Sequence, residues 1–205
     1  MAALTAAAIV LNVVGGEVVA RIGLPIYGDS VGTVIAGALG GPWIGALAGA
    51  STNVLWALLG RPNVLPFAVT AAAIGLLAGL ATRWGWMRSV WRAALAGLVT
   101  GVTAAIVSAP IAAWLFGGVT GAGTDLIVAF FRATGSSIQA AALGQGLVSD
   151  PIDKLATFLV AFFVLRALPQ RQLWRYPGAA AIVGARGRDG GDDPAANAPW
   201  VQGER

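Results

Sequence analysis

Seven polar and aromatic side chains stand inside or beside strongly apolar stretches, where they could bind a small molecule. They are Glu17, Tyr27, Asp29, Asn53, Trp56, Asp153 and Lys154. Ionisable groups in apolar surroundings normally face a cavity or one another, so they are candidates for function. Asn53 and Trp56 are three residues apart and share a helix face, where an amide and an indole could form a wall for a ring. We therefore expect these residues to bind a small solute.

The sequence gives little support to catalysis. The chain of 205 residues contains no cysteine and no histidine, which removes thiol chemistry, the commonest metal ligand and the usual proton shuttle. It lacks an HExxH motif, a Walker lysine and a glycine-rich cofactor loop between a strand and a helix. Asp150 and Asp153 share one predicted helix end, whereas an aspartyl protease needs aspartates on different helices. We expect no enzyme activity, no cofactor and no metal.

The composition indicates an all-α integral membrane protein. Hydrophobic residues make up 57% of the chain and charged residues 11%, and the mean hydropathy is +0.77. A soluble domain carries about 25% charged residues, so the lipid bilayer is the expected solvent. The arginines flank apolar runs, so we attribute the basic pI to membrane topology and not to nucleic acid. The expected location is the plasma (inner) membrane, crossed several times.

Six apolar runs predict a bundle of six transmembrane helices, since a span needs roughly 20 residues. The predicted spans are residues 3–20, 30–39, 43–59, 66–82, 90–116 and 151–168. Pro42 separates the second from the third, because proline lacks an amide proton and disfavours helix at the residue before it. One kinked helix over residues 30–60 would give five spans instead. Residues 117–150 are expected as a long connection, with an apolar piece, 126–131, at the membrane surface.

Positive charges orient this bundle. Arginines gather between the fourth and fifth spans and around the end of the sixth: Arg83, Arg88, Arg92, Arg166, Arg171 and Arg175. The positive-inside rule places both groups in the cytoplasm, and six spans then make both termini cytoplasmic. The candidate residues then converge on the outer face, where residues 21–30, RIGLPIYGDS, form a loop that could cover a ligand. With five spans, Glu17 and Asp29 would lie at the cytoplasmic face.

Several of these residues also have a purely structural interpretation. Asp150 before Pro151 is typical of a helix N-cap followed by proline, and Asp29 or Ser30 would cap the second span. Asp153 and Lys154 could pair with each other or meet lipid headgroups. Trp56 suits an interfacial aromatic belt as well as a cavity. An amide in mid-span, as at Asn12, typically joins helices.

Small residues recur at every fourth position and predict close helix packing. Gly37, Gly41, Gly45 and Gly49 form one such series, and Gly75/Gly79 and Gly97/Gly101 continue the pattern. Near the N-terminus, four alanines form a smooth patch that could take a partner helix: Ala2, Ala3, Ala6 and Ala7.

Two stretches and the alanine pairs resemble a known family. The stretches are LPIYGDSVGTVIAGALGGPWIGALAGASTNVL and SDPIDKLATFLVAFFVLRALPQR. Over residues 2–171 the chain resembles the substrate-specific S components of energy-coupling factor (ECF) vitamin transporters. The resemblance implies an S-component-like bundle that captures a vitamin or precursor at its outer face. It further implies import with a transmembrane T component, docked at the alanine patch, and two ATPase subunits.

The sequence thus predicts two regions and leaves two functions open. Residues 1–171 are expected to form the substrate-binding membrane domain, and residues 172–205 a largely disordered cytoplasmic tail. The main hypothesis is an S component of an ECF-type importer. The alternative is a ligand-sensing or structural membrane module that works without ATPase partners.

Overall fold

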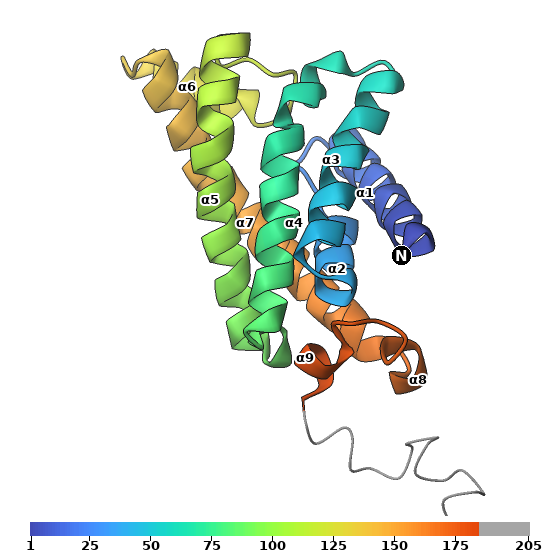
Figure 1. Ribbon diagram of the computed structural model, residues 1–205. Coiled ribbons are helices and arrows are strands. Elements are labelled where there is room, and N and C mark those ends of the chain that lie inside the picture. The colour runs from blue at the N-terminus through green and yellow to red at the C-terminus, as the bar shows by residue number, and fades with distance from the viewer. Residues whose placement is uncertain (185–205) are drawn as a thin grey trace, which may run out of the picture.

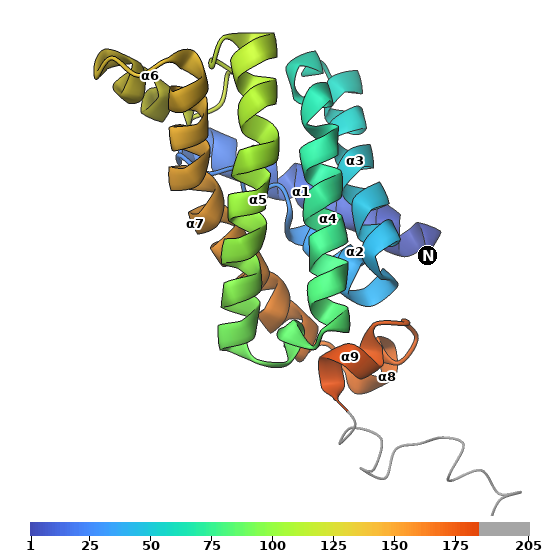
Figure 2. The same cartoon turned by 60° about the vertical axis from the view of Figure 1, so that its left-hand side comes forward.

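The computed structural model describes residues 1–184, and all regular structure in that range is helical. Four helices, α3, α4, α5 and α7, run side by side, while α1 lies obliquely across them (Figures 1 and 2). The short helix α2 packs between α1, α3 and α4, in the half of the bundle that is lower in Figure 1. The bounds of these helices are α1 (Ala2–Ile22), α2 (Val31–Gly40), α3 (Pro42–Leu58), α4 (Ala68–Arg83), α5 (Val90–Phe116) and α7 (Ile138–Ala167).

The helices confirm a multi-pass membrane protein. By length and hydropathy, three segments of the described chain could cross a bilayer: Ala2–Ile22, Pro62–Arg83 and Val90–Phe116. The second joins the 3-10 helix η1 (Pro62–Phe67) to α4. Helix α2 has only 10 residues, and at 1.5 Å per residue it covers about half of a hydrocarbon core of about 30 Å. The count of six spans and the cytoplasmic termini stay predictions.

The predicted break between the second and third helices is confirmed. Gly41 ends α2 with φ +94°, a conformation that glycine adopts without a steric penalty. Pro42 is the first residue of α3, where its missing amide proton removes no helical hydrogen bond. The chain therefore reverses direction within one residue, and α2 and α3 pack as neighbours.

Glycines let α2, α3 and α4 meet backbone to backbone. A Cβ on Gly75 of α4 would lie 2.1 Å from the carbonyl carbon of Gly45 in α3, closer than any side chain allows. A Cβ on Gly37 of α2 would lie 2.8 Å from the Gly75 carbonyl oxygen, and one on Gly79 would lie 2.3 Å from the Pro42 nitrogen. The predicted small-residue packing within the protein is confirmed for this group.

Helix α7 begins at Ile138, thirteen residues before the predicted start at residue 151. Ser137 caps it by accepting a hydrogen bond from the Ala140 amide at 3.2 Å. Pro151 lies inside the helix, which continues because α5 packs tightly there: a Cβ on Gly101 would lie 2.4 Å from the Pro151 Cα. That packing offsets the hydrogen bond that proline cannot donate. The predicted N-cap role of Asp150 is therefore wrong, since Asp150 lies in the interior of a helix.

The predicted connection over residues 117–150 is correspondingly shorter, because its last thirteen residues, 138–150, belong to α7. The apolar piece expected over residues 126–131 is part of a helix, α6 (Asp125–Ala133). α6 packs against α7 near one end of the bundle (Figure 2).

The chain after α7 folds against the opposite end of the bundle, through α8 (Gln170–Leu173) and α9 (Ala179–Val183). The Gly178 amide donates to the Leu39 carbonyl at 3.0 Å, and Leu173 and Ile182 are buried in the core. Arg88, in the 3-10 helix η2 (Trp86–Arg88), donates to the Ala181 carbonyl at 3.0 Å. Both arginine groups thus lie at one end. Residues 172–184 of the predicted tail are ordered here, and the rest of that tail lies outside the described residues.

Candidate ligand-binding site

A cavity of about 530 Å³ lies among the helices, within the range of about 300–1,000 Å³ that is usual for small-molecule sites. Its wall combines apolar and aromatic groups with buried polar ones from α1, α2, α3, α4, α5 and α7 and their connections. Of the seven predicted residues, the structure places five on this wall: Tyr27, Asp29, Asn53, Trp56 and Lys154. Five of the residues selected from the sequence therefore border one cavity, while ligand binding by these residues stays a prediction.

Two connections cover the cavity. The α1–α2 connection, residues 23–30, contributes Leu24, Tyr27 and Asp29 to its wall. The α5–α6 connection is held in place by the Asn63 amide, which donates to the Thr120 carbonyl at 2.7 Å. Asp125 accepts from the Thr120 and Gly121 amides at 3.0 and 2.8 Å. The position predicted for residues 21–30, beside the polar cluster, is confirmed.

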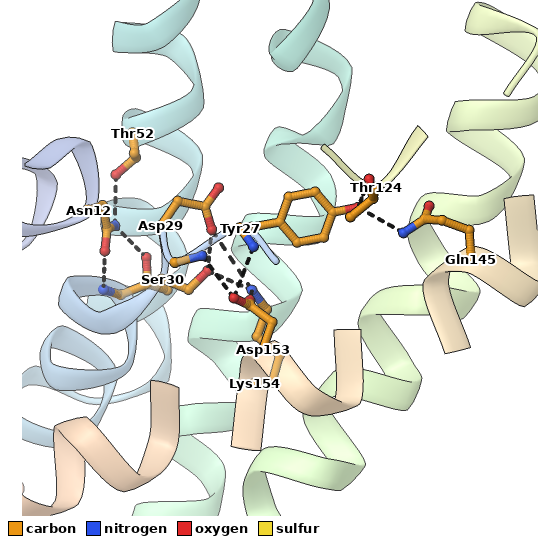
Figure 3. Close-up of polar contacts among 11 residues, drawn as sticks. Asn12, Tyr27, Asp29, Ser30, Thr52, Thr124, Gln145, Asp153 and Lys154 are labelled. Carbon is orange, nitrogen blue, oxygen red and sulfur yellow. Dashed lines mark hydrogen bonds and ion pairs between the residues drawn. The ribbon is translucent and has the colours of Figure 1, made fainter. Parts of the chain in front are cut away.

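Asp153 anchors the α1–α2 connection to the middle of α7. Its carboxylate accepts hydrogen bonds from the Tyr27 and Gly28 amides at 3.1 and 2.8 Å (Figure 3). Gly28 has φ +65°, and its carbonyl oxygen would lie 2.4 Å from a Cβ on Gly15 of α1. Asp153 itself is 1% exposed, and it lies behind the cavity wall and not on it. Its position supports a structural role.

Lys154 is the centre of the charged cluster. Its ammonium donates to the Asp153 carboxylate and to the Ser30 hydroxyl at 2.9 Å, and it lies 3.8 Å from the Asp29 carboxylate. The Ser30 hydroxyl in turn donates to Asp29 at 2.8 Å. The ammonium also lies 5.8 Å from the centre of the Tyr27 ring, within cation–π range. Of the structural alternatives for Asp153 and Lys154, the pairing with each other is confirmed, while a ligand role stays a prediction.

Asn12 provides the cap that the sequence assigned to Asp29 or Ser30. Ser30 stands at the N-cap of α2 but makes no side-chain cap hydrogen bond. Instead, the Asn12 side-chain oxygen accepts from the Thr33 amide at 3.1 Å in the first turn of α2. Its amide nitrogen donates to the hydroxyls of Thr33 and Thr52 at 2.8 and 2.9 Å. The predicted role of Asn12 in joining helices is confirmed, because it ties α1 to α2 and α3.

Tyr27 forms part of the wall through its side chain. The Gln145 amide donates to its hydroxyl at 3.2 Å, and that hydroxyl and the Thr124 hydroxyl share a hydrogen bond of 3.3 Å. Burial, with the negative charge of Asp150, raises the pKa of Tyr27 to about 12. The phenol is therefore protonated at physiological pH and keeps its capacity to donate.

Trp56 lies in the cavity wall and is 9% exposed, so the cavity interpretation is correct and the interfacial-belt interpretation is wrong. The Arg61 guanidinium lies 4.4 Å from the Trp56 ring centre and pairs with Glu17 at 2.8 Å. Glu17 is not part of the wall and reaches it only through Arg61. Asn53 donates to the Val64 carbonyl at 2.8 Å.

Sequence reasoning missed several wall residues. Asp150, Gln145, Thr70 and Arg61 all line the cavity. A signal for two of them was present: Gln145, Ser149, Asp150, Asp153 and Lys154 follow helical spacing across Pro151. That stripe indicates one continuous helix with a polar face. No comparable signal marks Thr70.

The charged cluster lies at a different depth from the predicted one. Asp153 stands halfway along the 30 residues of α7, not at its outer start. Asp29 and Ser30 lie beside it, because residues 23–30 fold back toward Gly15 before α2 begins. The cluster therefore lies beside the middle of α7 and not at a helix start, since α7 begins earlier and α2 is short; its position relative to the outer face stays a prediction.

The fold and the cavity define a multi-pass helical membrane protein with a solute-sized, partly polar site between its helices. Residues 1–109, more than half of the chain, match the family model described as "5TMR of 5TMR-LYT". This family comprises the five-transmembrane receptor regions of LytS-type sensor histidine kinases. The chain belongs to this family. No curated protein and no solved structure matches it.

The family match overturns the resemblance to ECF S components. The expected function as a vitamin importer is wrong, and so are the expected T component and ATPase partners. In the first of the two stretches that carried the resemblance, the glycines serve helix packing within the chain: a Cβ on Gly32 would lie 2.0 Å from the Ala8 carbonyl oxygen. Such small-residue patterns serve close approach in any membrane bundle. The alanine patch on α1 is exposed: Ala2, Ala3, Ala6 and Ala7. Because the transporter function is wrong, the assignment of this patch as a docking site for a T component is wrong too.

Proposed function

We propose that the chain is a ligand-sensing module of the plasma membrane, which binds a small solute in the cavity and reports its presence to a signalling partner. The observation that carries this proposal is the coincidence of a receptor family with a cavity of about 530 Å³ lined by buried polar and aromatic groups. The family serves sensor histidine kinases, so a kinase is the expected kind of partner. The proposed role is binding without catalysis.

The contacts around the cavity support a coupling between ligand and helices. Asp153 holds the α1–α2 connection, and Lys154 holds Asp29 and Ser30 at the start of α2. A ligand that contacts Tyr27 or Asp29 therefore acts on the segment that joins α1 and α2 to α7. A ligand can shift a conformational equilibrium only through such differential contacts.

The experiment that tests the proposal is recovery of a bound metabolite. The full chain, purified in a mild detergent or in nanodiscs, is denatured, and the released small molecules are identified by mass spectrometry. We expect one solute in near-stoichiometric amount, and the purified solute should raise the melting temperature on re-addition. Recovery of no solute, together with no shift on addition of a metabolite extract, would contradict the proposal.

Tyr27→Ala is the matched variant for this experiment. It removes part of the wall, and we expect the recovered solute to fall by about tenfold, a loss of about 1.4 kcal/mol of binding free energy. Tyr27→Phe keeps the ring and removes only the hydrogen bonds to Thr124 and Gln145, so it should retain more solute. Equal retention by both variants would show that the Tyr27 ring does not contact the solute.

We further propose that the end of the bundle bearing α8 and α9 faces the cytoplasm, because both arginine groups lie there. The absence of cysteine allows single-cysteine labelling without background. In whole cells, Thr134→Cys should react with a membrane-impermeant maleimide, and Gln172→Cys only after permeabilisation. Ala2→Cys then decides the span count, since six spans place it inside and five outside. Labelling of Gln172→Cys in intact cells would reverse the topology.

A further inference from the structure

Among residues 1–184, charge pairing leaves one carboxylate of the cavity wall without an ion-pair partner. In the part of the chain that the structure describes, the wall carries two cations, Lys154 and Arg61. Lys154 already pairs with Asp153 and Asp29, and Arg61 with Glu17. Asp150 also lies on the wall, and it forms no ion pair with any residue in the range 1–184.

Asp150 is deeply buried as well as unpaired. Asp150 is only 4% exposed, and it lies on the polar face of α7 between Gln145 and Lys154. A buried charge without a partner is strongly unfavourable, so such a carboxyl is either protonated or stabilised by an opposite charge. A bound cation that enters the cavity would supply that charge. The cavity is the open space that this carboxylate borders.

A second polar group of the wall is also unsatisfied. The Thr70 hydroxyl on α4 is buried and makes no hydrogen bond with any part of the described chain. Buried polar side chains nearly always have a partner, and the exceptions call for an explanation. Asp150 and Thr70 come from different helices and border the same cavity, so one bound molecule can satisfy both.

From these observations we infer that the cavity takes a small organic cation, whose protonated nitrogen pairs with Asp150. The inference rests on the proposed sensing function and names its ligand class. The apolar or ring-bearing part of the ligand packs against Tyr27, Trp56 and Phe67, whose side chains line the same wall. Thr70 contributes a hydrogen bond to a polar substituent of the ligand.

The alternatives of opposite charge fit the wall poorly. An anionic ligand would need a cation without a partner, and both wall cations are already paired within the described chain. It would also lie beside Asp150 and Asp29, and like charges at short range repel strongly in an apolar setting. Three aspartates, Asp29, Asp150 and Asp153, lie around one lysine, Lys154. A cationic ligand would balance this excess of negative charge.

The test uses three probes of nearly the same shape and different charge: benzylammonium, benzyl alcohol and benzoate. Binding to the full chain in nanodiscs is measured by the change in melting temperature and by quenching of tryptophan fluorescence. We expect benzylammonium to bind, benzyl alcohol to bind at least about tenfold more weakly and benzoate not to bind. Asp150→Asn should weaken benzylammonium by about tenfold or more, and Asp150→Glu should restore part of the loss.

The outcomes separate this inference from the proposed function. Preferential binding of benzoate or benzyl alcohol would overturn the cationic ligand class and leave ligand sensing intact. Undiminished binding of benzylammonium to a folded Asp150→Asn variant would overturn the assignment of Asp150. Binding of none of the probes would overturn the inference, whereas the proposed function stands or falls on the recovered metabolite. If Asp150→Asn fails to fold, the single substitution Thr70→Val provides a second variant. It is expected to lower the affinity for benzyl alcohol, because the Thr70 hydroxyl is lost.

Discussion

Asp153→Asn is expected to lower the free energy of unfolding by about 3–5 kcal/mol, the usual range for breaking a buried ion pair from one side. The substitution removes the charge that lies closest to Lys154 and weakens the acceptor of the Tyr27 and Gly28 amides. Lys154 is 3% exposed, and Asp29, its remaining ion-pair partner within residues 1–184, lies farther away at 3.8 Å, so the lost carboxylate is compensated only in part. Thermal unfolding of the purified protein measures the effect.

The same variant should loosen the loop that covers the cavity. Hydrogen–deuterium exchange over residues 23–30 should become faster, because the two amides lose their charged acceptor. Glu17→Gln is the matched control: it breaks the half-exposed pair with Arg61, which is worth about 0–1 kcal/mol. Lys154→Met combined with Asp153→Asn should recover part of the stability, since no buried charge of the pair remains and the side-chain amide oxygen introduced at position 153 can still accept from the Tyr27 and Gly28 amides. A melting temperature of Asp153→Asn equal to that of the wild type would refute the role assigned to this pair.

Gly75→Val is expected to disrupt the bundle at the crossing of α3 and α4. A Cβ at this position would overlap the Gly45 carbonyl group, at 2.1 Å from its carbon and 2.2 Å from its oxygen. Overpacking a core typically costs 1–3 kcal/mol, and the cost here should be about 3 kcal/mol or more because the obstacle is backbone and cannot rotate away. We expect a large fall in folded yield and in melting temperature.

Ala156→Val is the control for added volume. Ala156 is an exposed position on α7, so its larger side chain should leave the melting temperature nearly unchanged. Gly75→Ala gives an intermediate test with one added carbon. Wild-type stability in Gly75→Ala would show that α3 and α4 do not approach as closely as the structure describes.

The sequence by itself determined the features that depend on local chemistry. The low charge content and long apolar runs predict a helical membrane protein, because only helices and closed barrels satisfy the backbone in lipid. The break at residues 40–42 follows from the backbone preferences of glycine and proline. The fifth helix was predicted with its observed bounds, residues 90–116, because polar or glycine-rich segments adjoin both its ends.

Only the tertiary structure decided the site. Pro151 predicts a helix start from local preference, yet the helix continues through it because Gly101 lets α5 pack against it. That one difference moves Asp150 from a cap at the surface to an unpaired carboxylate on a buried wall. The short α2 and the pinned α1–α2 connection place Asp29 beside Lys154, from positions 125 residues apart in the chain. Such pairings depend on which helices pack together across long sequence distances, and hydropathy and spacing mark a helix face that packs closely without identifying its partner helix.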